Sequence, residues 1–244
     1  METEQFLTTD YQWTDLVVNE AALKQITELY ECAKKKKGCS ALFHGPSGTG
    51  KTLSGSLLGK ELGREVVRID LSMVISKYIG ETEKNLEKLF ARAEIKNWIL
   101  FFDEADALFG KRTDVKDAHD KYANKEVSYL LQRIEKFNGM VIFATTQKSN
   151  IDDAFIRRLR YVIPFPIPEP PERLLLWEKN LFKTNLPTST IDLPAIASKF
   201  ALSGAAIGDV VQHLVKKTSG SSKIQRINND LIIDHIQTFA NQNK

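Results

Sequence analysis

The chain has 244 residues, of which 42% are hydrophobic and 27% charged, a composition typical of soluble globular proteins. This length exceeds what one compact domain usually needs, so two domains are the starting expectation. The formal net charge of +3 is too small to indicate nucleic-acid binding by itself. No apolar run reaches the roughly 18 residues of a membrane-spanning helix, and no secretory signal is recognisable at the N-terminus.

Cysteine usage bears on the redox compartment. Cys32 and Cys39 are seven positions apart, with neither a CxxC spacing nor histidine partners at a metal-binding spacing. We therefore expect neither a disulfide framework nor a zinc site, and a reducing cytoplasm fits this pattern best.

Up to residue 165, two apolar patterns alternate along the chain. Short runs of consecutive apolar residues predict strands, and apolar residues at every third or fourth position predict helices. The predicted strands are residues 40–44, 65–69, 98–102, 140–144 and 161–165, and the predicted helices are residues 16–33, 53–62, 82–93 and 123–137. This alternation is typical of a parallel sheet covered by helices on both faces, so this part is predicted to be α/β.

A proline-rich stretch, residues 164–172, ends this pattern. Its five prolines are incompatible with a helix interior and with a central strand. Beyond it, helical spacing recurs in residues 172–182, 193–200, 205–217 and 228–240. We therefore expect an α/β domain at residues 1–167 and a small helical domain at residues 168–244.

The sequence GPSGTGKT, from Gly45 to Thr52, lies between a predicted strand and a predicted helix. It fills every position of the phosphate-loop pattern G-x-x-x-x-G-K-[ST], in which backbone amides and the following helix N-terminus hold phosphates. Lys51 is expected to reach the β- and γ-phosphates of ATP, and Thr52 to bind Mg²⁺. A flexible glycine turn is the alternative. The expected nucleotide contacts are Gly45, Pro46, Ser47, Gly48, Thr49, Gly50, Lys51, Thr52 and Leu53.

The sequence WILFFDEAD is the second chemical motif. Its apolar run ends in Asp103 and Glu104, which places two carboxylates at the carboxyl end of a central strand, where ligands of open α/β sheets bind. Asp103 is expected to hold Mg²⁺ and Glu104 to polarise the attacking water. A buried strand that runs into a solvated acidic turn is the alternative, and Asp106 is expected to be a solvated residue at a helix start.

The segments GPSGTGKT, FFDEAD and FATTQKSNIDDAFIRRL resemble the AAA+ ATPases, specifically the AAA clade, and the resemblance covers nearly the whole chain. It implies a P-loop NTPase fold of the AAA+ type with a small all-α lid domain, and hydrolysis of ATP with Mg²⁺. Thr146 takes the sensor position, where the family usually carries asparagine. Arg157, Arg158 and Arg160 are the candidate arginine fingers. The run RRLR departs from the family's spacing, so it stays open which arginines match the family's finger positions. Arg157 and Arg158 are the preferred fingers, and the alternative is that these arginines are merely solvated or salt-bridged.

An arginine finger acts on the nucleotide of a neighbouring subunit, so the resemblance implies a ring or spiral of identical chains, such as a hexamer. It also implies further nucleotide contacts. Gly204 and Ala205 match the family's second sensor segment without its arginine, and Asp15, Leu16 and Val17 match the segment that closes over the base.

The sequence KYIGETEKNL resembles the family's central-pore loop. In this resemblance Lys77, Tyr78, Ile79 and Gly80 form the loop, and Tyr78 and Ile79 grip an extended polypeptide. The alternative is a capped helix start, in which Thr82 is the cap and Tyr78 packs on the core.

The leading hypothesis is an oligomeric ATPase that remodels, unfolds or disassembles protein complexes, without a membrane partner. The tract DKYANKEVSYLLQRIEKFNG looks most like bacterial AAA ATPases associated with contractile injection systems. One alternative is nucleic-acid machinery such as a helicase loader or clamp loader. The composition of the pore-like loop argues against it, because the loop is aromatic and acidic rather than basic. Another alternative is an ATP-dependent assembly switch that does not hydrolyse ATP. The presence of both Asp103 and Glu104 argues against it.

Overall fold

The computed structural model describes residues 5–35, 38–70, 81–106, 129–184, 186, 191–219 and 229–242. The chain divides into two compact units. The first comprises Met1–Trp13, Glu20–Gly45 and Lys51–Phe165, and the second comprises Thr14–Asn19, Pro46–Gly50 and Pro166–Lys244. The division after Phe165 falls inside the proline-rich stretch. Two short segments from the N-terminal part of the chain belong to the second unit, which a single cut in the sequence does not anticipate.

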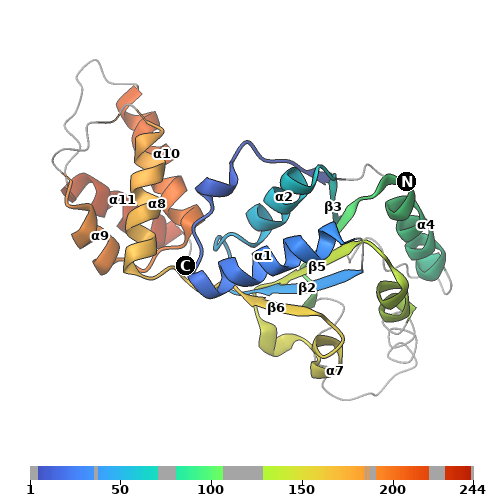
Figure 1. Ribbon diagram of the computed structural model, residues 1–244. Helices are drawn as coiled ribbons and strands as arrows, with labels where there is room; N and C mark the ends of the chain where they lie inside the picture. Colours follow the sequence, from blue (N-terminus) through green and yellow to red (C-terminus); the bar gives the residue numbers. More distant parts are fainter. Residues whose placement is uncertain are drawn as a thin grey trace. The chain divides into compact units, whose positions relative to one another are not determined.

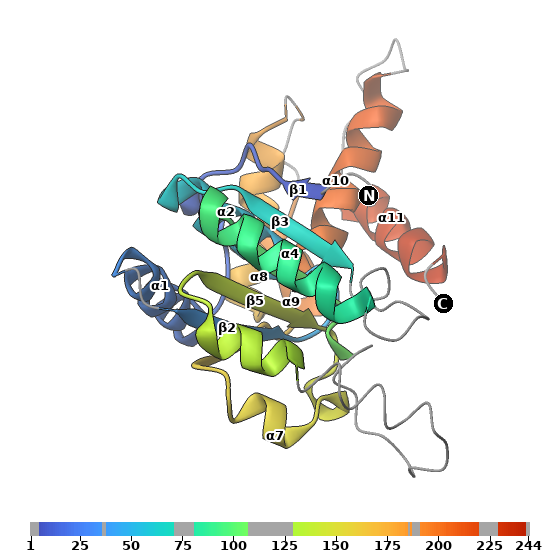
Figure 2. The same ribbon diagram turned by 90° about the vertical axis from the view of Figure 1, so that its right-hand side faces the viewer.

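A six-stranded sheet forms the centre of the first unit (Figures 1 and 2). The strands are β1 (Gln5–Leu7), β2 (Cys39–His44), β3 (Val66–Asp70), β4 (Ile99–Asp103), β5 (Met140–Thr145) and β6 (Tyr161–Pro164), in the spatial order β1-β3-β4-β5-β2-β6. All neighbours are parallel except β1, which runs antiparallel to β3. Apolar spacing did not reveal this edge strand, because three residues are too few to show a period.

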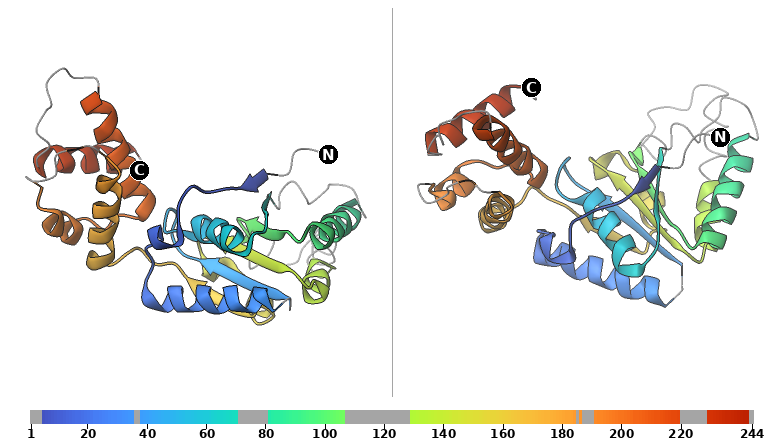
Figure 3. Two further views of the ribbon diagram at one scale, coloured as in Figure 1. Left: turned by 45° about the horizontal axis from the view of Figure 1, so that its top comes forward. Right: turned by 90° about the horizontal axis from the view of Figure 1, so that it is seen from above.

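The central strands are apolar because both of their faces are covered. Every residue of β5 is buried. On β4, Phe102 belongs to a cluster with Phe90 of one helix layer, whereas Phe101 lies against Gly55 of the other. The right panel of Figure 3 shows these two layers on opposite sides of the sheet. The predicted α/β architecture is therefore confirmed.

The helices of the first unit form these two layers. One contains α1 (Glu20–Lys34) and α2 (Lys51–Leu62), and the other contains α4 (Glu81–Lys96), helical residues 129–136 and α7 (Asp153–Ile156). Two short 3₁₀ helices, η1 (Trp13–Asp15) and η2 (Lys148–Asn150), complete the described elements before Phe165. None of the helices among the described residues is both long enough and apolar enough to span a bilayer.

The helices α8 (Pro170–Phe182), α9 (Leu193–Lys199), α10 (Gly204–Ser219) and α11 (Asn229–Gln242) make up the helical part of the second unit. Their core centres on Trp177, Ile207, Leu214 and Ile232, which are fully buried. The buried Arg173 guanidinium donates hydrogen bonds to the backbone carbonyls of Pro168 and Ala197, which satisfies an otherwise costly buried charge. The predicted helical C-terminal part is thereby confirmed.

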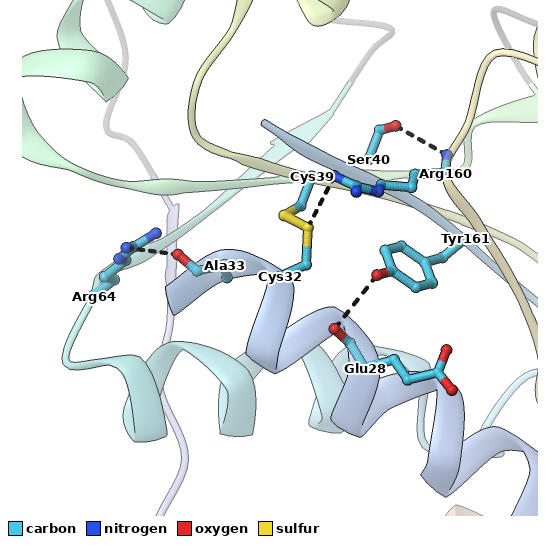
Figure 4. The surroundings of a disulfide bond; sticks show 8 residues. All are labelled: Glu28, Cys32, Ala33, Cys39, Ser40, Arg64, Arg160 and Tyr161. Atoms are coloured by element: carbon cyan, nitrogen blue, oxygen red, sulfur yellow. Dashed lines mark hydrogen bonds between the residues drawn. A yellow bond between two sulfur atoms is a disulfide. The ribbon is translucent and has the colours of Figure 1, made fainter. Parts of the chain in front are cut away.

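The two cysteines are bonded to each other, so the expectation of no disulfide is wrong. Cys32 lies in the last turn of α1 and Cys39 is the first residue of β2 (Figure 4). The chain reverses direction between these elements, which brings the two Cα atoms to 6.4 Å, a normal separation for a disulfide. Sequence spacing alone did not reveal this reversal.

Candidate active site at the carboxyl edge of the sheet

Three parallel strands of the first unit end at the same edge of the sheet, which we term the carboxyl edge. His44, the last residue of β2, pairs with Thr145, the last residue of β5, and Phe102 of β4 pairs with Phe143 of β5. The residues that follow these strand ends therefore emerge side by side. This edge is where open α/β sheets bind their ligands.

Lys51 is the first residue of α2, and its side chain extends toward this edge. Its side chain is buried, and its ammonium group donates a hydrogen bond to the Gly45 carbonyl at 2.5 Å. Burial lowers the pKa of Lys51, and the nearby negative charge of Asp103 opposes this shift. A buried ammonium at a helix N-terminus favours an anion such as phosphate. Thr52, the next residue, is exposed.

Gly45 begins the phosphate-loop sequence and requires glycine for two reasons. Its φ is +142°, which other residues rarely adopt, and a Cβ atom would collide with the Phe165 carbonyl. Its amide donates a hydrogen bond to the Thr145 carbonyl at 3.2 Å. The loop therefore starts in a fixed position against β5 and the end of β6.

Asp103 and Glu104 emerge from β4 in different environments. The Asp103 carboxylate forms an ion pair with Arg68 of β3 at 2.7 Å and accepts a hydrogen bond from the Glu104 amide at 3.1 Å. Glu104 is exposed and has a φ of +52°, a left-handed conformation that is unusual for glutamate. Such backbone strain is concentrated at functional sites. Sequence reasoning identified both carboxylates but missed Arg68.

The end of β5 carries a buried hydroxyl that sequence reasoning also missed. Thr145 is 2% exposed, and its hydroxyl donates a hydrogen bond to the Asp106 carboxylate at 2.8 Å. Asp106 is therefore not simply solvated, which corrects that expectation, because its carboxylate is tied to β5. Thr146, the expected sensor residue, is exposed one position beyond. The only sequence signal for Thr145 was its place at the predicted strand end.

His44 precedes the phosphate loop at the end of β2. Burial lowers its pKa, and the positive charges of Lys148 and Lys51 add to this effect. A neutral imidazole is therefore favoured next to Lys51, where a second positive charge would be repelled.

The three candidate finger arginines follow α7 and are all exposed, but their surroundings differ. Arg158 forms an ion pair with Glu135 at 3.0 Å. The Arg160 guanidinium donates to the Cys32 sulfur at 3.3 Å. Within the described part of the chain, Arg157 makes no hydrogen bond or ion pair through its side chain.

The tip of the phosphate loop, Pro46–Gly50, belongs to the second unit. The Ala205 amide donates to the Gly48 carbonyl at 3.0 Å, and a Cβ atom at Gly48 would lie 2.6 Å from the Ser203 hydroxyl. A Cβ atom at Gly50 would lie 3.8 Å from both Leu16 and Val18. The structure therefore brings the loop tip to the two segments that the sequence singled out around Asp15 and Gly204.

The segment that contains Asp15 has its own anchors within the second unit. Lys183 forms an ion pair with Asp15 at 3.0 Å, and Lys179 donates to the Thr14 carbonyl at 2.7 Å. Both lysines come from the C-terminal end of α8 and its cap. The predicted pore loop, Lys77, Tyr78, Ile79 and Gly80, lies outside the described residues.

A model of the ATPase family associated with various cellular activities (AAA) matches residues 41–167, or 127 of the 244 residues. The 26S proteasome regulatory subunit 6B homolog of Dictyostelium discoideum is 31% identical over 188 residues, covering 72% of this chain and 46% of that protein. Proteasome-activating nucleotidase 2 of Halobacterium salinarum is 30% identical over 192 residues, covering 75% and 46%. Spastin of Ixodes scapularis is 32% identical over 162 residues, covering 64% and 25%. The chain spans less than half the length of these relatives.

Proposed function

Because the chain belongs to the AAA family of ATPases, we propose that it binds and hydrolyses ATP and uses the energy to remodel protein complexes as a homo-oligomer. The observation that carries the proposal is the carboxyl edge of the sheet. There, the buried Lys51 ammonium at the N-terminus of α2 lies within electrostatic reach of Asp103, the carboxylate that ends β4.

Phosphate binding follows from the chemistry of residues 45–52. Lys51 donates to a carbonyl in the structure, and a phosphate oxygen is a stronger acceptor that also compensates the buried charge. The loop amides and the N-terminus of α2 supply further positive potential. Within the second unit, Leu16 and Ala205 lie beside the loop tip and are the residues we assign to the nucleoside.

Hydrolysis needs a base, a metal and a means of placing water. Glu104 is exposed next to Asp103 and accepts a hydrogen bond from the attacking water. Thr52 and Asp103 offer the oxygen ligands that Mg²⁺ prefers, and the ion, when bound, neutralises charge on the phosphates. Thr146 orients the water or a phosphate oxygen, and the hydrogen bond from the buried Thr145 to Asp106 fixes the strand end from which it extends.

Arg157 is the residue we assign as the principal finger. Its side chain has no partner among the described residues, whereas those of Arg158 and Arg160 are engaged with Glu135 and Cys32. An exposed guanidinium can reach the nucleotide of a neighbouring copy and stabilise the charge that develops during phosphoryl transfer. The active form is therefore an oligomer.

Two relatives support a protein rather than a nucleic-acid client, because their names refer to the proteasome. The modest net charge agrees with this proposal, because nucleic-acid machinery usually carries a strong basic patch. Within this proposal Tyr78 and Ile79 contact the client. The likeness to ATPases of contractile injection systems stays a prediction about the pathway.

The test compares Tyr78→Ala with the unchanged protein in ATP turnover, alone and with an unfolded model protein such as casein or with single-stranded DNA. We expect casein to accelerate hydrolysis in the unchanged protein and to lose this effect in Tyr78→Ala, with basal turnover retained. The matched control is Tyr11→Ala, which alters an exposed tyrosine outside the proposed loop. Stimulation by DNA alone would refute the protein-client proposal, and absence of Mg²⁺-dependent hydrolysis in the assembled protein would refute the ATPase assignment.

A further inference from the structure

The disulfide joins two elements that lie directly beside the finger segment, residues 157–160. Cys32 is in the last turn of α1, and Cys39 starts β2. The residue after Cys39 is Ser40, whose carbonyl and hydroxyl accept hydrogen bonds from the Arg160 amide at 3.1 and 3.2 Å. The cross-link therefore anchors the same strand end to which Arg160 is bonded.

The Arg160 side chain contacts the disulfide itself. Its guanidinium donates to the Cys32 sulfur at 3.3 Å, and Figure 4 shows it lying against the sulfur pair. Arg160 is thus held to Ser40 through its backbone amide and to Cys32 through its side chain. Arg157, the proposed finger, lies three positions earlier in the same segment, so we expect a change in the anchoring of Arg160 to alter the placement of Arg157.

A cavity of about 420 Å³ opens on Cys32 and is lined also by Glu28, Glu31, Lys35, Arg160 and Tyr161. Figure 4 shows the Tyr161 hydroxyl directed at the Glu28 carbonyl, to which it donates at 3.4 Å on one wall. This volume lies in the range of small-molecule sites. Its lining carries both acidic and basic side chains, which suits a small thiol that bears amino and carboxylate groups.

We propose that Cys32 and Cys39 are a thiol–disulfide redox site, reduced by a small zwitterionic thiol that enters this cavity, and that the bonded state holds Arg157 ready to act. The second half of the proposal rests on the function assigned to Arg157 above. The disulfide adjoins a cavity and the Arg160 guanidinium, and a nearby cation favours the thiolate form that thiol–disulfide exchange requires.

The thiol–disulfide exchange proceeds in two steps. The thiolate of the small thiol attacks the sulfur of Cys32, a residue that lines the cavity and is 7% exposed against 2% for Cys39. A mixed disulfide forms on Cys32, and the electron pair of the broken bond leaves on Cys39, which takes up a proton. A second small thiol attacks the mixed disulfide, forming the oxidised dimer of the small thiol and releasing Cys32. The Arg160 charge stabilises this leaving sulfur while it is anionic.

The first test follows the thiols of the full chain in mixtures of reduced and oxidised glutathione, quenched with acid, alkylated and counted by intact mass. We expect reversible conversion between no free thiols and two. Cys39→Ser, which keeps Cys32, should form a mixed disulfide with glutathione faster than its matched counterpart Cys32→Ser, and Arg160→Gln should reduce this advantage. Two free thiols in every mixture, or equal rates for the two serine variants, would overturn the redox site.

The second test measures ATP turnover of the oxidised and the reduced chain under assembling conditions. Reduction should lower turnover at least about fivefold, the lower range of typical coupling between sites. The double variant Cys32→Ser/Cys39→Ser should not respond to the reductant, and Arg157→Ala should abolish the difference. Equal turnover in both states overturns the regulatory inference. Failure of the ATPase assignment would appear differently, as an absence of turnover in either state while the thiol counts still respond.

Discussion

The Arg68 guanidinium of β3 lies 2.7 Å from the Asp103 carboxylate at the end of β4, so the residue proposed to hold Mg²⁺ is ion-paired within the chain. The two strands are neighbours, and Asp70 of β3 pairs with Asp103, which places Arg68 beside the carboxyl edge. Both side chains are partly exposed, so the pair is weak enough to be displaced. If Asp103 holds Mg²⁺ as proposed, Arg68 and the ion compete for the same carboxylate.

This competition predicts the effect of Arg68→Ala. Removing the guanidinium should lower the Mg²⁺ concentration for half-maximal binding of a fluorescent ATP analogue by roughly twofold to fivefold, as expected for a partly exposed ion pair. Lys88→Ala removes an exposed cation of α4 and is the matched control. An unchanged or increased Mg²⁺ requirement in Arg68→Ala would show that Arg68 positions Asp103 rather than competing for it.

Lys51→Met should have opposite effects on the stability of the chain without nucleotide and on its stabilisation by ATP. Burial lowers the pKa of Lys51, so the folded state disfavours its charged form, and this cost is present at neutral pH and relieved as the pH rises toward 10.5. The variant should therefore unfold at a higher temperature without nucleotide. It should also lose the ligand stabilisation, about 2.7 kcal/mol at a hundredfold excess over Kd, that ATP confers on the unchanged chain.

Both effects are measured by thermal unfolding with and without ATP and Mg²⁺. Lys60→Met, at an exposed position of the same helix, serves as the control and should retain the ATP effect. Retention of ATP stabilisation by Lys51→Met would refute the phosphate-loop assignment.

Arg157→Ala should lower turnover by about a thousandfold or more, the range found for arginine fingers, without weakening ATP binding. Arg158→Ala should cost less, because Arg158 is engaged with Glu135. Mixing Arg157→Ala with Glu104→Gln should restore some turnover, since the two defects then fall on opposite sides of some subunit contacts. Absence of recovery, in mixtures shown by native mass measurement to co-assemble, would contradict action between subunits.

His44 predicts a pH dependence of stability. Its folded-state pKa is lowered by burial and by Lys148 and Lys51, so the unfolded chain binds the proton more readily. The contribution of neutral His44 is therefore present above about pH 6.5 and is lost as the pH falls through the folded-state pKa. Denaturant unfolding from pH 7.5 to 5 should show a smaller loss of stability in His44→Gln than in the unchanged chain. His213→Gln, at an exposed position, is the control, and parallel losses in all three proteins would contradict the prediction.

Local patterns were sufficient for much of this molecule. The apolar run from Ile99 to Phe102 predicted a buried strand, because a strand covered on both faces must be apolar throughout. Asp103 and Glu104 follow this run and were predicted to lie at the edge of the sheet, and the structure has them there. Glycines at Gly45 and Gly48 were expected from the motif, and the structure supplies the close approaches that require them.

Other features depend on contacts between distant segments. Arg68 meets Asp103 only because β3 and β4 pair in one register, and Thr145 meets Asp106 only because β5 lies next to β4. No single segment of the sequence shows the order of the strands. The sequence around Arg68 or Thr145 therefore did not indicate that either residue contacts an acidic residue of the site. The same holds for Arg160 and Cys32, which are separated by 128 positions.

Periodicity and motif spacing act over a few neighbouring residues, so they predicted most of the helices and strands and the phosphate-loop motif. Which side chains contact one another depended on packing between distant segments. This packing paired Asp103 with Arg68, Arg158 with Glu135, and Arg160 with the bonded cysteines, and it left Arg157 without a partner among the described residues. Ion pairs and disulfides form wherever the packed chain brings groups within a few ångströms, regardless of their distance in sequence.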